Sequence, residues 1–184
     1  MGLLRTGINE VIATTSFNAA PMGIHYRGGK ASMILFTGSH TARNIEHDGW
    51  VIANFLHDPA LYVKTAFEDL SHEFFSEEVV SGKTMHRLAV TDAWAAFTAT
   101  VERRTGEVMV VSLKPEREII EEVSLYPINR GFNSIIDATV HATRYKENQD
   151  PELKKMIEYH AGIVRKCGGK REQEALEMLM RYIA

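Results

Sequence analysis

Apolar and β-branched residues recur in short runs between turn signals up to about Pro127, and helical periodicity replaces this pattern afterwards. Strands are predicted over residues 9–17, 21–26, 31–38, 50–56, 92–104, 107–113 and 116–126. Several of these runs are apolar on both faces, which a sheet exposed on one side does not require. A closed barrel would bury such strands, so the pattern favours a barrel for this part of the chain.

Local signals place one turn and two short helices within this β-rich part. The two glycines in Arg27–Lys30 tolerate the positive φ of a tight hairpin, so the second and third strands are predicted to pair antiparallel. Ser39 is placed to cap a helix that ends near Gly49. Asp58 and Pro59 supply an N-cap and a first-turn proline for another helix. Each predicted helix directly follows a strand.

From Asn129 onward the apolar spacing is typical of amphipathic helices. The apolar positions are Phe132, Ile135, Ile136, Val140, Leu153, Met156, Ile157, Val164, Leu176, Leu179 and Ile183. Asp150 and Pro151 are expected to open the second of these helices, and Gly168 with Gly169 to end it. The fold class predicted from these patterns is α+β, mainly β, with a helical region at the end of the chain.

Composition excludes several classes of function. The 21 basic and 24 acidic residues give a net charge of −3, so neither nucleic acid nor an anionic membrane is an expected partner. No apolar run is long enough to span a bilayer and the first residues lack a signal-peptide pattern, so a cytoplasmic location is expected. The single cysteine, Cys167, is interpreted as a buried thiol. The eight histidines lack metal-ligand spacing, and no metal site is expected.

The stretch GSHTARN, residues 38–44, runs from a predicted strand into a helix. A helix N-terminus presents unpaired backbone N–H groups and the positive end of the helix dipole. Ser39, Thr41 and Arg43 would add donors suited to a phosphate group. The alternative is that Ser39 simply caps the helix and binds no ligand.

The stretch NAAPMGIHY, residues 18–26, is irregular for a strand. Pro21 removes a ladder donor and Gly23 removes a side chain, which leaves the backbone partly unpaired and open to close approach. A planar ring lying there could bond to the free peptide groups, with Met22 as a polarisable contact. An edge strand or bulge without a ligand is the alternative.

Four stretches, taken in their order along the chain, resemble the FMN-binding split-barrel superfamily, in its flavin reductase-like branch. They are NAAPMGI, GSHTARNI, VIANFLHDP and NRGFNSIIDATVHATR. They are similar in particular to a family of mostly archaeal proteins of unknown function. The resemblance covers nearly the whole chain and implies an FMN-binding split barrel over residues 1–127 and a helical region over 128–184. It also implies a homodimer with FMN at the subunit interface.

Transferred to this sequence, the resemblance implies two groups of cofactor-binding residues. The isoalloxazine ring would be lined by Pro21, Met22, Gly23 and Ile24. The phosphate or ribityl chain would be held by Ser39, Thr41 and Asn44. Asn54 is a further candidate, because an amide within an apolar strand is costly unless it is paired, either with the flavin or with a neighbouring loop.

The function that the resemblance implies is an FMN-dependent oxidoreductase acting on an unknown small molecule. The flavin would carry the chemistry, so no catalytic side chain is assigned, and NAD(P)H is a possible transient hydride donor. A carrier or sensor that binds FMN without turnover is the alternative. The Arg-rich phosphate pattern of pyridoxamine-phosphate oxidases is missing, which disfavours pyridoxal chemistry.

Two further sets of charged residues have open roles. His86 and Arg87 would face the flavin or a partner subunit, or would form an exposed loop pair. Arg130, Asp137 and Arg144 follow one another at intervals of seven residues on a predicted helix. They are interpreted either as an ion network that docks the helical region onto the barrel or as a lid whose arginines meet an acidic substrate.

Overall fold

The computed structural model describes residues 2–184, which form two compact units. The barrel unit comprises the chain up to Leu56 together with Asp69–Ser124, and the helical unit comprises His57–Glu68 with Leu125–Ala184. The helix after Asp58 therefore packs with the C-terminal helices, although it lies between two strands in the sequence. A division of the chain at residue 127 does not take this segment into account.

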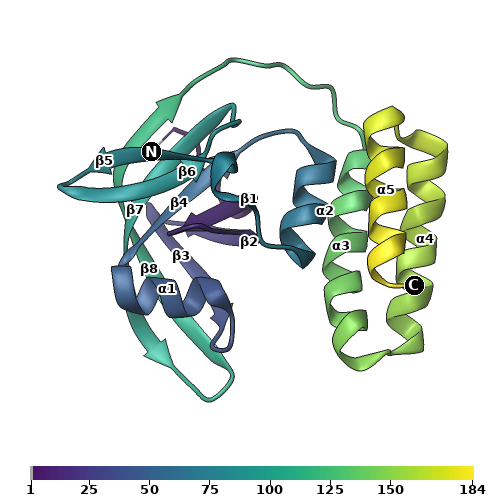
Figure 1. The fold of residues 1–184 in the computed structure, drawn as a ribbon, viewed down its shortest axis with the longest axis horizontal. Coiled ribbons are helices and arrows are strands. Elements are labelled where there is room, and N and C mark those ends of the chain that lie inside the picture. Colours follow the sequence, from purple (N-terminus) through teal and green to yellow (C-terminus); the bar gives the residue numbers. More distant parts are fainter. Residues whose placement is uncertain (1) are drawn as a thin grey trace. The chain divides into compact units, whose positions relative to one another are not determined.

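The barrel unit contains eight strands and two short helices in its described part (Figure 1). The strands are β1 (Gly7–Thr15), β2 (Asn18–Arg27), β3 (Lys30–Phe36), β4 (Trp50–Phe55), β5 (Phe75–Val80), β6 (Lys83–Leu88), β7 (Ala93–Arg104) and β8 (Val108–Ile120). The helices are α1 (His40–Asp48) and the single 3₁₀ turn η1 (His72–Phe74). Six strands close an antiparallel barrel in the order β1-β2-β3-β8-β7-β4, and β5 pairs with β6 in a separate hairpin. The predicted barrel is confirmed.

Alternate residues of the barrel strands fill its core, as the period of two requires. The interior is built from apolar side chains that include Val11, Ala13, Ile24, Met33, Leu35, Val51, Phe97, Met109 and Val111. The predicted hairpin joins β2 to β3, and Gly28 and Gly29 have φ values of 56° and 77° there. Ser39 caps α1 by accepting a hydrogen bond from Ala42 N–H, as predicted.

The two strands predicted over 107–113 and 116–126 are parts of a single strand, β8, which runs from Val108 to Ile120. The prediction of a strand over 121–126 was wrong. Pro115, which pairs with Phe97 at a register shift of the β7–β8 ladder, interrupts the apolar pattern within β8. The hairpin of β5 and β6 was not predicted, because charged residues occupy many of its positions and its apolar runs are short.

The helical unit consists of α2 (Pro59–Phe67), α3 (Arg130–Asn148), α4 (Pro151–Cys167) and α5 (Lys170–Tyr182) (Figure 1). Its core is formed by apolar residues from all four helices, among them Val63, Ile135, Ala138, Ile157, Ala161, Val164, Leu176 and Leu179. Cys167 is a half-buried free thiol at the end of α4, less buried than predicted. None of the described helices is both long and apolar enough to cross a bilayer.

Candidate functional site

Strand β2 has an open edge. It pairs with β1 from Thr15↔Asn18 to Gly7↔Tyr26, but it pairs with β3 only over His25–Arg27. In the described chain, residues 18–24 therefore have no ladder partner on the side away from β1. Pro21 and Gly23 lie within this segment, as expected for backbone that is only partly paired.

The four residues expected to line a ring occupy this edge in two different ways. Pro21, Met22 and Gly23 are half-buried, and a Cβ at Gly23 would lie 2.9 Å from Cγ2 of Ile8. The side chain of Ile24 is fully buried in the barrel core. Its side chain is therefore not available to a ring on the open edge, and only its backbone remains a candidate contact.

The N-terminus of α1 retains unpaired donors. Oγ of Ser39 accepts from Ala42 N–H at 3.1 Å, and the carbonyl of Ser39 accepts from Arg43 N–H at 3.3 Å. Helix geometry leaves the N–H groups of His40 and Thr41 without an intrahelical acceptor. Ser39 is half-buried and His40 is exposed, whereas Thr41 is buried, so an anion from solvent would meet the helix end on the side of Ser39 and His40.

The open edge and the N-terminus of α1 are adjacent. Nδ2 of Asn18, the first residue of β2, donates to Oγ1 of Thr41 at 3.1 Å. Nδ2 of Asn44 donates to the carbonyl of Thr15 at 3.0 Å and to its Oγ1 at 3.2 Å. Thr41 is buried. The hydrogen bonds of Asn18 and Asn44 therefore fix α1 against the β1–β2 turn. Asn18 was not among the predicted site residues, although it begins the irregular stretch.

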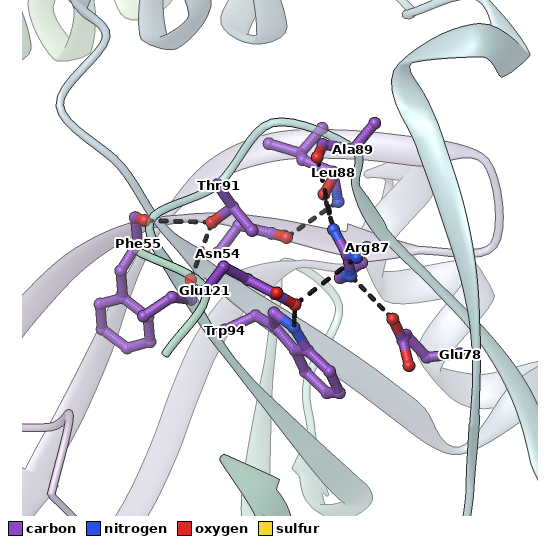
Figure 2. Close-up of polar contacts among 10 residues, drawn as sticks. Asn54, Phe55, Glu78, Arg87, Leu88, Ala89, Thr91, Trp94 and Glu121 are labelled. Carbon is purple, nitrogen blue, oxygen red and sulfur yellow. Dashed lines mark hydrogen bonds and ion pairs between the residues drawn. The ribbon is translucent and has the colours of Figure 1, made fainter. Parts of the chain in front are cut away.

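Asn54 is a structural residue in this geometry. It is fully buried on β4, and its Nδ2 donates to the carbonyl of Ile12 at 2.9 Å and to Oγ1 of Thr14 at 3.1 Å. Its Oδ1 accepts from Leu88 N–H at 2.9 Å, as Figure 2 shows. These partners are all protein groups and the side chain is fully buried, so the Asn54 amide is not presented to a ligand. The interpretation of Asn54 as a structural hydrogen-bonding residue is the one that the geometry favours.

Arg87 also belongs to a structural network (Figure 2). Its Nε bonds to Oε1 of Glu78 at 2.9 Å, and its Nη2 lies 3.5 Å from Oε1 of Glu121. The indole N–H of Trp94 donates to the same Glu121 oxygen at 2.8 Å. Arg87 is therefore committed to holding the β5–β6 hairpin on the barrel, and only His86 of this pair remains a candidate for ligand contact.

Of the two interpretations of the charged residues on α3, an ion network among them is not supported within the described residues. The structure contains no ion pair joining Arg130, Asp137 and Arg144, all of which are exposed in the described chain. Residues seven apart are two helical turns apart, which exceeds the reach of a direct pair. Asp137 instead lies 4.0 Å from Nδ1 of His160 on α4. Within residues 2–184, no group of three or more acidic, histidine or cysteine residues is arranged to hold a metal ion.

Comparison with known structures agrees with the barrel topology. An FMN-bound protein from Methanosarcina mazei, MM1853, is 34% identical, with a TM-score of 0.92 over 97% of this chain and 96% of that one. The 2-nitrobenzoate 2-nitroreductase NbaA of Pseudomonas fluorescens shares the fold at 12% identity, with a TM-score of 0.52 over 65% of this chain and 68% of that one. The chain therefore has the FMN-binding split-barrel fold of flavin reductase-like proteins.

Comparison of sequences extends the likeness to both units. An uncharacterised protein of Methanocaldococcus jannaschii, MJ1453, is 23% identical over 196 residues, covering 96% of this chain and 98% of that one. The family model for the N-terminal domain of DUF447, a protein family of unknown function, matches residues 9–122. The C-terminal DUF447 model matches residues 129–181. The chain thus belongs to the DUF447 family, over its barrel and its C-terminal helices alike.

Proposed function

We propose that the chain binds FMN, with the ring on the open edge of β2 and the phosphate at the N-terminus of α1. The observation that carries this proposal is the contact between Asn18 and Thr41, which joins an unpaired strand edge to a helix N-terminus. A phosphorylated planar molecule needs both features next to each other. The FMN-bound relative from M. mazei, at 34% identity over nearly the whole chain, supports the same ligand.

The residues present fit this cofactor. The N–H groups of His40 and Thr41, together with the Ser39 hydroxyl, would hold the phosphate. The backbone of Pro21 and Gly23, which lacks a ladder partner on the side away from β1, would meet the edge of the ring. When bound, FMN supplies hydride-transfer and one-electron chemistry. The protein would orient the ring and exclude water from it.

A homodimer with FMN at its interface is part of the proposal. By strand register, Gly23 and His25 share the outer face of the barrel with Ile34 and Phe36 of β3. Ile34 is 55% exposed and Phe36 is 70% exposed. A second copy laid over this face would bury these side chains and cover a ring on the adjacent open edge. Sedimentation of the purified protein, with Phe36→Glu as the disrupting variant, tests this arrangement.

We infer an FMN-dependent oxidoreductase that takes electrons from NAD(P)H or a similar donor. Anaerobic titration of the FMN-loaded protein with NADPH and with NADH tests this activity. Rapid bleaching of the flavin band supports turnover. An FMN-loaded protein that no donor reduces would instead favour the alternative, a flavin carrier or sensor.

One substitution tests the phosphate position without breaking the helix. Aspartate is as good an N-cap as serine, so Ser39→Asp preserves the start of α1 while placing a negative charge where the phosphate would bind. We expect FMN affinity to fall at least ~10-fold, measured by flavin fluorescence. The matched control is Asn129→Asp, which adds the same group at the N-cap of α3. Full FMN affinity in the Ser39→Asp protein would refute the phosphate assignment.

A further inference from the structure

A cavity lies in the helical unit, at the last turns of α2 and α5. These two helices pack against each other, and their last turns supply the residues that line the cavity. Lys64 and Glu68 come from the end of α2, and Met178, Arg181 and Tyr182 come from the end of α5. We call this cavity the α2–α5 pocket. Its volume of about 280 Å³ is near the lower limit of ~300 Å³ for pockets that hold drug-sized ligands, so it suits a small molecule.

Tyr182 connects the two helices at the α2–α5 pocket. Its hydroxyl donates to Oε1 of Glu68 at 2.5 Å, and its ring is stacked on Phe67 with centroids 4.8 Å apart and planes at 17°. Burial, followed by the hydrogen bond to Glu68, raises the pKa of Tyr182 to about 12, so the phenol keeps its proton near neutral pH. A titratable group with a shifted pKa beside a cavity is a common feature of binding sites.

The charged groups of the α2–α5 pocket have an excess of positive charge. Lys64 and Arg181 are cationic, and Glu68 is the single carboxylate among the lining residues. That carboxylate already accepts the Tyr182 hydroxyl. The guanidinium of Arg181 is exposed and has no hydrogen bond or ion pair within residues 2–184, although its charge is close enough to lower the pKa of Tyr182 against the effects that raise it. An anion is therefore the ligand that this lining favours.

The position of the two cations at helix ends offers a structural alternative. Basic side chains in the last turn of a helix balance the negative end of its dipole, and Lys64 and Arg181 both occupy such positions. Arg165 occupies the equivalent position at the end of α4 but does not line the pocket. A comparison of Arg181 with Arg165 therefore separates a role in ligand binding from a role at the helix end.

We propose that the α2–α5 pocket binds a small organic carboxylate. The guanidinium of Arg181 would hold the carboxylate group, with the charge of Lys64 nearby, and the apolar part of the molecule would lie against Met178 and Tyr182. All of these residues belong to the helical unit, whereas the residues proposed to hold FMN belong to the barrel unit. The inference therefore goes beyond the proposed function and does not depend on it.

Benzoate is a suitable probe, because it combines a carboxylate with an apolar ring. Benzamide has the same ring without the charge, and acetate has the charge without the ring. Binding is followed by nuclear magnetic resonance of the full chain labelled at its methionine methyl groups, with and without FMN. Met178→Leu assigns the pocket signal by removing it. The methyl group of Met156, which is 44% exposed on α4, is the internal control.

Benzoate should shift the Met178 methyl signal saturably and leave the Met156 signal in place. Benzamide and acetate should each bind at least ~10-fold more weakly. Arg181→Gln should weaken benzoate binding ~10-fold, because it removes a charge-assisted hydrogen bond, whereas the matched control Arg165→Gln should bind like the unchanged protein. Met178→Trp, which fills the cavity with a larger side chain, should abolish binding, and circular dichroism at 222 nm checks that this variant folds.

Several results would overturn the proposal: no saturable shift of the Met178 signal, benzamide or acetate binding as tightly as benzoate, full affinity in Arg181→Gln, or equal losses in Arg181→Gln and Arg165→Gln. Equal losses would mean that both arginines act only on the helix ends. The pocket and the FMN site are tested separately. Benzoate binding in a chain that takes up no FMN would support the pocket and refute the proposed function, and FMN binding without benzoate binding would do the reverse.

Discussion

Replacing Asn54 with alanine separates its structural role from a role in ligand binding. The amide of Asn54 connects three parts of the barrel unit, since it bonds to Ile12 and Thr14 on β1 and to Leu88 on β6. Removing it leaves the N–H of Leu88 without an acceptor in a buried position. The β5–β6 hairpin would also lose its hydrogen bond to β4.

The expected cost follows from these bonds. A buried N–H left unpaired costs about 1–3 kcal/mol, and each of the other two hydrogen bonds contributes about 0.5–1.5 kcal/mol. The free energy of unfolding should therefore fall by about 2–6 kcal/mol. With a typical urea dependence of about 2 kcal/mol per molar, the unfolding midpoint should move down by roughly 1–3 M.

Tryptophan fluorescence during urea unfolding is the appropriate assay. Both tryptophans of the chain, Trp50 and Trp94, are buried in the barrel unit, so their emission reports on that unit. Asn133→Ala, at an exposed position of α3, is the control and should leave the midpoint unchanged. Asn54→Asp should be at least as damaging as alanine, because it places a carboxylate oxygen against the carbonyl of Ile12.

Affinity for FMN under native conditions completes the test. If Asn54 acts only through the scaffold, the fraction of Asn54→Ala protein that remains folded should bind FMN within ~2-fold of the unchanged protein. The opposite pattern would refute this role for Asn54: the unfolding midpoint of Asn54→Ala stays unchanged and FMN binding is lost. That pattern would mean that the amide contacts the ligand and that its three protein partners contribute little to stability.

Three further predictions concern the helical unit. Gly131→Ala should lower the free energy of unfolding of the helical unit by about 1–3 kcal/mol, because the new Cβ would lie 2.4 Å from Cα of Gly168. Circular dichroism at 222 nm monitors this unfolding, and an unchanged transition would contradict the close contact between Gly131 and Gly168. Burial, and then the neighbouring charge of His160, lower the pKa of His141 below 6.5. The folded state therefore resists protonation of His141, so the free energy of unfolding should be highest above pH 6.5 and should decrease as the pH falls through the lowered pKa. His141→Phe should reduce this pH dependence. An identical pH profile for His141→Phe would argue against a contribution from His141. Burial, followed by the hydrogen bond to Glu68, raises the pKa of Tyr182 to about 12. Ultraviolet titration of the folded protein should therefore show a phenol that ionises well above pH 10. This phenol should be missing in Tyr182→Phe.

Local signals in the sequence were sufficient for much of the barrel. The paired glycines of Arg27–Lys30 and the serine cap at Ser39 each specify a turn or helix start by the conformation of a few neighbouring residues. The β5–β6 hairpin could not be predicted in the same way. Its strands are short and carry many charges, and their place is set by distant partners such as Asn54 and Glu121.

The assignment of α2 to the helical unit illustrates the same limit. Asp58 and Pro59 predict where the helix begins, and the structure confirms both the cap and the start. Which core the helix joins depends on whether its apolar face fits the barrel or the C-terminal helices. That choice is settled by long-range packing of residues such as Val63 against α3 and α5, which no local pattern encodes.

The cofactor residues implied by family resemblance separate into two physical groups. Gly23 lies on the stretch of β2 that has no ladder partner away from β1, and the Ser39 hydroxyl lies at the start of α1, whereas Thr41 and Asn44 use their side chains to fix α1 against the β1–β2 turn. Resemblance to a short motif does not distinguish a residue that contacts the ligand from one that positions a neighbouring contact residue. Substituting Thr41 or Asn44 would therefore weaken ligand binding by displacing the N-terminus of α1, and would lower the stability of the barrel as well. Ser39→Asp should change affinity alone, so the ratio of the two effects distinguishes the residues that build the site from those that contact its ligand.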